Sequence, residues 1–204
     1  VEPGQIVLVG GGDATLTRVP VEADQLPAGQ SARPASLAEL AKATARALKA
    51  SGTRSVTVLV DDTAFRGPGT APGWPSSYVE TGVVSPVSAL SADSGKVTAD
   101  SRVRDADPAL AAGRWFATRL SKAGITVAPE VGRATGAAAA EELAGVSSPP
   151  VADLVGGEGV VDAVGAVKVA ASEGEDVERA LADPPAGKVE VVTGLVDGEP
   201  AGDF

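Results

Sequence analysis

One strongly marked helix limits what this chain can fold into. Ser36 is a typical N-cap, Glu39 stands three residues later as its capping-box partner, and Gly52 follows the expected last turn. Apolar residues and one threonine recur at helical spacing across residues 37–48, so the helix has one apolar face. A helix with this pattern is expected to pack that face on a sheet.

Two short apolar runs, residues 5–9 and 54–60, predict buried strands before and after that helix. Strand, helix and strand in this order are typical of an α/β unit, with Val7 and Val58 expected in neighbouring strands. Glycines at positions 10–12 end the first run, but the spacing of a dinucleotide-binding fingerprint is not completed after them. A structural turn is therefore expected there rather than a phosphate site.

A second helix is predicted from Asp107 to Ala123. Asp107 is a typical N-cap, Pro108 suits the first helical position, and Gly124 ends the pattern. Residues 125–127 would then form a strand. The fold class predicted from the whole pattern is α/β, with α+β as its looser form.

Composition limits the core and the partners. The chain has 204 residues, 44% of them hydrophobic but only 3% aromatic, with 25 glycines and 15 prolines. Such a chain can bury a core built mainly from Val, Ala and Leu and interrupted by many turns. Its formal net charge of -10 disfavours nucleic acid as a partner, because phosphate binding requires clustered Lys and Arg.

The absence of His and Cys excludes several chemistries. Without them the chain has no thiol nucleophile, no His general base, no zinc site of the usual kinds, no disulfide and no Ser-His-Asp triad. Asp100, Asp105 and Asp107 lie close in sequence, but they lack the spacing and the central glycine of a calcium loop. We therefore expect no metal and no cofactor.

No membrane-spanning or targeting segment is apparent in the sequence. No window approaches 18 uninterrupted apolar residues, and the first residues lack a basic start followed by an apolar run. We expect no transmembrane segment and no signal peptide within this chain.

Two acidic and two aromatic residues are the candidates for ligand contact. Asp61 and Asp62 follow the second strand, where paired carboxylates can act as acid and base or bind a cation. In the structural alternative, one carboxylate caps the following turn and the other is solvated. Trp74 and Tyr78 belong to a Gly- and Pro-rich stretch, where Trp74 either stacks on a ligand or, the favoured reading, packs over the sheet.

Five short segments together resemble one enzyme family. They are VLVGGGD at residues 7–13, VLVDDTAF at 58–65, PGW at 72–74, SPVSAL at 85–90 and SSPPVADLV at 147–155. The set resembles the penicillin-binding D-alanyl-D-alanine carboxypeptidases of the S13 peptidase class, over about residues 5–155. The resemblance implies mixed α/β domains that are inserted into a penicillin-binding DD-peptidase, with an incomplete or absent transpeptidase-like core.

The catalytic motifs of that family are missing from this chain. Members carry a Ser-x-x-Lys whose serine is acylated, a Ser-x-Asn, and a Lys-Thr-Gly on a strand lining the site. No lysine here follows a serine at that spacing, every lysine is followed by Ala or Val, and the chain contains no Asn. No catalytic residue can therefore be assigned.

The resemblance implies a substrate and a location. Family members act on peptidoglycan stem peptides outside the cytoplasm, and the cleft for the peptide side chain lies near the strand that ends at Asp61. Relatives are expected to carry an acidic residue just beyond the aromatic of this segment, whereas Phe65 is followed here by Arg66. By resemblance, Asp61, Asp62, Trp74 and Tyr78 are weak candidates for substrate binding.

The sequence leaves the role of the chain open. Residues 1–130 are predicted to form the inserted α/β domains, and residues 131–204 a partial remnant of the catalytic-type domain or an unassigned α/β segment. The chain is either a fragment or degenerate member of the carboxypeptidases, inactive as given, or a non-enzymatic module that binds peptidoglycan or a protein. Its oligomeric state is not indicated.

Overall fold

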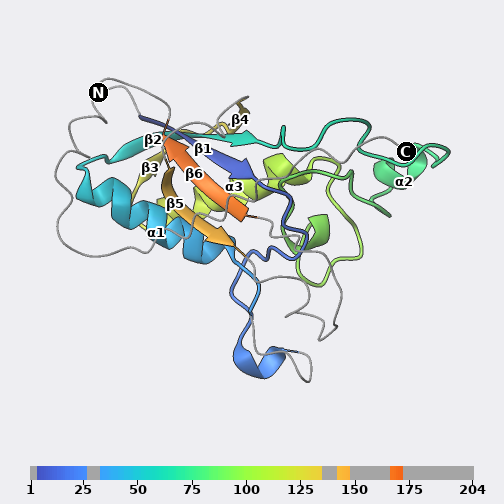
Figure 1. The fold of residues 1–204 in the computed structure, drawn as a ribbon, viewed down its shortest axis with the longest axis horizontal. Coiled ribbons are helices and arrows are strands. Elements are labelled where there is room, and N and C mark those ends of the chain that lie inside the picture. The colour runs from blue at the N-terminus through green and yellow to red at the C-terminus, as the bar shows by residue number, and fades with distance from the viewer. Residues whose placement is uncertain (1–3, 27–32, 135–141, 148–165, 172–204) are drawn as a thin grey trace, which may run out of the picture.

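The computed structural model describes residues 4–26, 33–134, 142–147 and 166–171. A mixed sheet forms the centre of this part of the chain (Figure 1). Its strands are β1 (Gly4–Gly10), β2 (Ser55–Asp61), β3 (Thr126–Val127), β4 (Gly132–Arg133), β5 (Glu142–Ser147) and β6 (Ala166–Ala171). The α/β fold class expected from the sequence is confirmed.

The order of the strands is β3-β2-β1-β6-β5, and β4 also pairs with β2. β1 and β2 are parallel, with Ile6 opposite Val58 and Val7 opposite Leu59. The prediction of neighbouring strands at Val7 and Val58 is therefore confirmed. β3 and β4 run parallel to β2, whereas β6 is antiparallel to both β1 and β5.

Two long helices, α1 (Leu37–Ala50) and α3 (Pro108–Lys122), cover one face of the sheet. Alternate residues of β1 and β2 point to that face, among them Leu8 and Val58, and they form one buried cluster with the apolar faces of both helices. Phe116 of α3 is the largest side chain in this cluster and is fully buried. The core is otherwise built from Val, Ala, Leu and Ile, as the composition implied.

Helix α1 begins as its sequence predicts. Ser36 Oγ accepts a hydrogen bond from the Glu39 amide at 3.3 Å and donates one to Glu39 Oε2 at 2.7 Å. The glutamate thus reaches the serine hydroxyl, a variant of the expected capping box. Gly52 has a φ of +79°, the left-handed conformation that ends a helix most easily at glycine.

Helix α3 also begins at the predicted cap and approaches the sheet closely. Asp107 Oδ1 accepts a hydrogen bond from the Leu110 amide at 3.0 Å. Gly113 lies so close to β2 that a Cβ on it would stand 2.5 Å from Val60 Cγ1. This glycine therefore sets how near the helix packs to the strand.

Residues beyond position 130 contribute to the same sheet, through β4, β5 and β6. The division of the chain at residue 130 stays a prediction. Most of the segment 147–155 lies outside the described residues, as does most of the stretch 156–204 that the sequence left unassigned.

Between β2 and α3, residues 62–104 form a long connection whose part around Ser77–Glu80 extends away from the sheet (Figure 1), whereas Leu90 and Ala92 return to the buried core. This segment holds the single-turn helix α2 (Ser77–Glu80) and the 3-10 turn η2 (Asp93–Gly95), and a further 3-10 turn, η1 (Ala23–Gln25), lies earlier in the chain. No helix among the described residues is long and apolar enough to cross a membrane.

Candidate functional site

The ends of β1 and β2 lie at the same edge of the sheet because the two strands are parallel. Val9 is paired with Asp61, so the glycines after β1 and the acidic residues after β2 leave the sheet side by side. In open α/β sheets, ligands bind at this carboxyl edge. The family-like segments 7–13 and 58–65 therefore meet where a site would be expected.

The glycines after β1 make room for a third family-like segment, residues 85–90. A Cβ on Gly10 would stand 2.4 Å from the carbonyl oxygen of Ala89 and 2.6 Å from Leu90 Cβ. The Gly12 amide donates a hydrogen bond to that same carbonyl at 2.8 Å. Only glycine fits at position 10, so the 85–90 backbone packs directly against the glycines that follow β1.

Gly12 also supports the aromatic residue of the second segment. It has a φ of +91°, and a Cβ there would stand 2.6 Å from Cζ of the Phe65 ring. Gly10 is the last residue of β1 and the turn lies at residues 14–15, just beyond the three glycines where it was predicted, while Gly10 and Gly12 serve packing. The three segments 7–13, 58–65 and 85–90 thus form one interlocked unit.

Asp61 closes the end of β2. Its side chain is buried, with the residue 2% exposed, and Oδ1 accepts hydrogen bonds from the amide and the hydroxyl of Thr63 at 3.0 and 2.6 Å. Asp13 and Thr15 repeat this arrangement after β1, at 2.9 and 2.8 Å. The expectation that one of the paired carboxylates caps the following turn is confirmed for Asp61.

Asp62 is not simply solvated, and that expectation is wrong. The guanidinium of Arg133, at the end of β4, donates from Nη1 to Asp62 Oδ1 and from Nη2 to both carboxylate oxygens of Asp107, at 2.7 and 2.8 Å. The hydrogen bonds that Arg133 donates, first to Asp62 and then to Asp107, raise the pKa of Arg133 above its usual value. Arg133 therefore links the end of β2 to the first turn of α3.

Ser88 joins this network from the 85–90 segment. Its Oγ lies 3.2 Å from Asp62 Oδ2, accepts a hydrogen bond from the Leu90 amide at 3.2 Å, and lies 3.1 Å from the Leu90 carbonyl oxygen. We call Asp62, Ser88, Asp107 and Arg133 the strand-end cluster. All four members are bound to each other or to backbone groups, which is the pattern of a brace between elements.

The strand-end cluster lacks the parts of a nucleophilic site. An acylated serine requires an adjacent base, such as the lysine of Ser-x-x-Lys, whereas the carboxylate beside Ser88 is held by Arg133. Among the described residues, no group of three or more acidic side chains could hold a metal ion. Asp105 Oδ1 accepts a hydrogen bond from the Asp107 amide, and the Asp107 carboxylate binds the Leu110 amide and Arg133.

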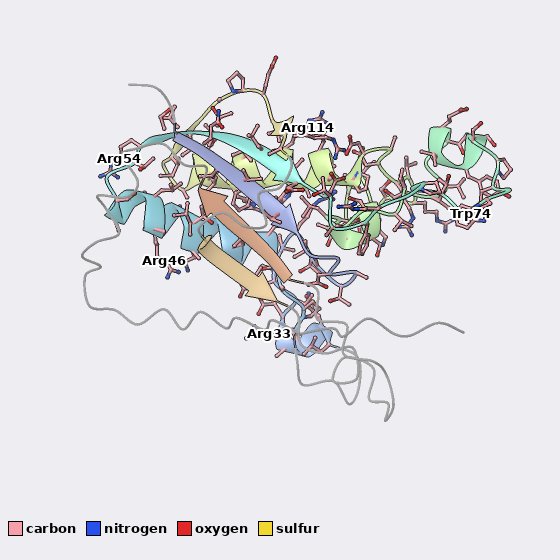
Figure 2. The ribbon with its side chains drawn as sticks, turned by 45° about the horizontal axis from the view of Figure 1, so that its top comes forward. Arg33, Arg46, Arg54, Trp74 and Arg114 are labelled. Carbon is pink, nitrogen blue, oxygen red and sulfur yellow. The ribbon has the colours of Figure 1, made fainter. Side chains whose placement is uncertain are left out.

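Trp74 and Tyr78 are far from this cluster. Figure 2 shows Trp74 at the outer end of the segment that extends from the sheet. The Trp74 residue is 50% exposed and Tyr78 is 42% exposed, and their rings meet edge to face with centroids 6.2 Å apart. The favoured prediction that Trp74 packs over the sheet is wrong, because the Gly- and Pro-rich stretch carries it outward.

The structure brings Asp61 and Asp62 together at the strand ends, and Trp74 and Tyr78 together at the outer tip, but it does not join the two pairs. Their role in substrate binding stays a prediction. Arg133 was missed by sequence reasoning because its partner Asp62 is 71 residues away. No local pattern around Arg133 in the sequence indicated this role.

The sequence comparisons identify the family to which the chain is similar. The model of the D-Ala-D-Ala carboxypeptidase 3 (S13) family matches residues 1–104 and 98–157. The chain belongs to this family. The match includes the three segments that interlock at the strand ends, and it confirms the resemblance found in the sequence.

Two curated relatives are mycobacterial carboxypeptidases. Carboxypeptidase Rv3627c of Mycobacterium tuberculosis is 37% identical over 153 residues, which are 72% of this chain and 30% of that protein. Carboxypeptidase DacB of Mycolicibacterium smegmatis is 37% identical over 122 residues, 58% of this chain and 25% of that protein. The chain thus spans less than a third of the length of these relatives. No solved structure matches.

Proposed function

We propose that this chain is a non-catalytic part of a serine-type D-alanyl-D-alanine carboxypeptidase that acts on peptidoglycan stem peptides outside the cytoplasm. By itself the chain is inactive. The observation that carries the proposal is that the family-like segments are used for packing. Gly10 and Gly12 seat the 85–90 backbone, and Asp62 braces Arg133.

The chemistry of the chain supports this reading. Hydrolysis through an acyl-enzyme requires a nucleophile whose proton is taken by a neighbouring base. No Ser-x-x-Lys, Ser-x-Asn or Lys-Thr-Gly exists anywhere in the 204 residues. At the strand ends the one hydroxyl of the cluster, that of Ser88, stabilises a turn through Leu90. The residues that remain can shape and support a site but cannot open a peptide bond through this mechanism.

A second candidate is a non-enzymatic module that binds peptidoglycan or a protein. The observation that favours it is the exposed pair of Trp74 and Tyr78, because exposed aromatic rings are common in binding surfaces. A module of this kind would bind a muramyl peptide without cleaving it.

The test compares this chain with the product of the longest reading frame that contains it. D-Alanine release from a stem pentapeptide ending in D-Ala-D-Ala is measured for both, and binding of the same peptide is measured by calorimetry. Release by the longer product alone is the expected result. Release by the 204-residue chain would refute the proposal, and tight binding by the chain without release in either protein would favour the module.

A further inference from the structure

An open cavity of about 280 Å³ lies between α3 and two loops that pack beside it. Residues of α3 between positions 111 and 118 form one wall, at the spacing of a single helix face. Arg18, which follows β1, and Val97 and Asp105, which precede α3, form the other walls. Pockets for small ligands begin at about 300 Å³, so this cavity has room for one small molecule. We call it the α3 cavity.

Arg18 brings a buried guanidinium with one unused donor to the α3 cavity. Its side chain is only 12% exposed, and Nη1 donates a hydrogen bond to the Val97 carbonyl at 3.2 Å and lies 3.6 Å from Asp93 Oδ2. Nη2 donates to the Lys96 carbonyl. The Nε–H, in contrast, is buried and has no hydrogen-bond partner among the described residues. Such buried donors are rare in folded proteins, and an acceptor on a bound molecule would satisfy this one.

Two opposite charges also line the α3 cavity without being paired. Arg114 and Asp105 form no ion pair with each other or with any other described residue. Asp105 Oδ1 accepts a hydrogen bond from the Asp107 amide at 2.9 Å, which leaves its second carboxylate oxygen for another donor. A small molecule that carries both an anionic and a cationic group would complement this pair of charges.

A strained turn positions Arg18 at the cavity. Asp93 and Ser94 have φ values of +52° and +55°, in the left-handed region that is uncommon for residues other than glycine. Asp93 Oδ1 accepts a hydrogen bond from the Arg18 amide at 3.1 Å, and Arg104 donates one to the Ser94 carbonyl. Strain of this kind persists where the surrounding contacts enforce it, and it is concentrated at ligand sites.

The rest of the lining favours a compact apolar group over a sugar. Val97, Ala111 and Trp115 supply apolar surface to the α3 cavity. Arg119 already covers the Trp115 ring, with its Cζ 4.4 Å from the ring centroid. A sugar would require an open aromatic face and a polar partner for each hydroxyl. An aliphatic side chain requires only the apolar contacts that are present.

We propose that the α3 cavity binds a free α-amino acid whose side chain is apolar and about the size of leucine. The carboxylate of the ligand binds the Arg114 guanidinium and accepts a hydrogen bond from the Arg18 Nε–H. Its ammonium group donates to the second carboxylate oxygen of Asp105, and its side chain packs on Val97 and Trp115. The inference goes beyond the proposed function and does not require it, because every residue involved belongs to the described part of this chain.

The test is an NMR titration of the ¹⁵N-labelled 204-residue chain with L-leucine and, separately, with D-leucine. The chain has two tryptophans, and Trp74 lies far from Arg114 and its neighbour Trp115, so its indole N–H signal is an internal control (Figure 2). Trp74→Phe assigns the two signals. At least one enantiomer is expected to shift the Trp115 signal saturably and to leave the Trp74 signal in place. No shift of the Trp115 signal up to about 10 mM of either enantiomer would overturn the proposal.

Matched analogues test the two charges of the ligand. Leucinamide lacks the carboxylate, and 4-methylpentanoate lacks the ammonium group. Each is expected to bind about 10- to 100-fold more weakly than leucine, because each loses a charge-assisted hydrogen bond. An analogue that binds as tightly as leucine would overturn the proposal, and so would N-acetylglucosamine binding more tightly than leucine, in favour of a sugar site.

Matched variants test the two charges of the chain. Arg114→Gln and Asp105→Asn are each expected to weaken leucine binding about tenfold or more. Asp105→Asn retains a side-chain oxygen for the Asp107 amide, so the turn before α3 is preserved. Arg46→Gln is the control, because Arg46 is also exposed on a helix without an ion pair among the described residues but does not line the cavity. An equal effect of Arg46→Gln and Arg114→Gln would contradict the proposal.

Leucine binding and D-alanine release fail independently. A 204-residue chain that binds no leucine refutes the amino-acid site and leaves the proposed function intact. A longer reading-frame product that releases no D-alanine refutes the proposed function, whatever the titration of this chain shows.

Discussion

Replacing Gly10 by alanine tests the interlock of the family-like segments. The added Cβ would stand 2.4 Å from the Ala89 carbonyl oxygen and 2.6 Å from Leu90 Cβ. Neither contact is the flexible end of a side chain, so the 85–90 backbone would have to move. Overpacking of this kind costs about 1–3 kcal/mol. Movement of Ala89 also weakens its hydrogen bond with Gly12, worth about 0.5–1.5 kcal/mol.

Gly10→Ala is therefore expected to lower the free energy of unfolding by about 2–4 kcal/mol. Gly4→Ala is the control in the same strand, because a Cβ on Gly4 meets nothing closer than 3.7 Å. Urea unfolding followed by circular dichroism measures both. With an m-value of about 2 kcal/mol per molar urea, Gly10→Ala should lower the midpoint by about 1–2 M. A Gly10→Ala midpoint within about 0.2 M of that of Gly4→Ala would refute the interlock.

Three further substitutions probe the contacts around the strand ends, each by urea unfolding. Thr63→Val removes the hydroxyl that binds buried Asp61 and should lower the free energy of unfolding by about 1.5–3 kcal/mol, whereas Thr63→Ser keeps the hydroxyl and should lower it less. Equal losses for the two variants would contradict the capping role of Asp61. Asp107→Ala should lower the free energy of unfolding by about 0.5–2 kcal/mol more than Asp107→Asn, because asparagine retains the cap of α3. A smaller loss for alanine than for asparagine would contradict the capping role of Asp107. Gly113→Ala should destabilise by about 1 kcal/mol despite its better helix propensity, because its Cβ meets Val60; a gain in stability would show that α3 can shift.

Local sequence signals predicted the two long helices and the two neighbouring strands. Ser36, Glu39 and Gly52 mark the ends of α1 by chemistry within a few residues, and the same is true of Asp107 at α3. The alternation along β2 likewise gives the face that the helices cover. These features depend on near neighbours, and a single sequence contains that information.

The site depended on contacts between distant residues. Arg133 reaches Asp62 across 71 positions, and no local pattern links them. The triple glycine predicted a turn, but its purpose became clear only from the approach of Ala89. Trp74 was placed wrongly because hydrophobic character alone favours burial, whereas the turns between residues 67 and 75 direct it outward.

One measurement tests whether the chain lacks the catalytic serine of its family. Intact mass spectrometry of the purified chain before and after incubation with a penicillin detects acylation of a reactive serine. The chain is predicted to keep the mass of its 204 residues, because it has no Ser-x-x-Lys and the Ser88 hydroxyl is committed to a turn. A covalent adduct at one-to-one stoichiometry would contradict the account and show that the chain carries a catalytic serine of its own.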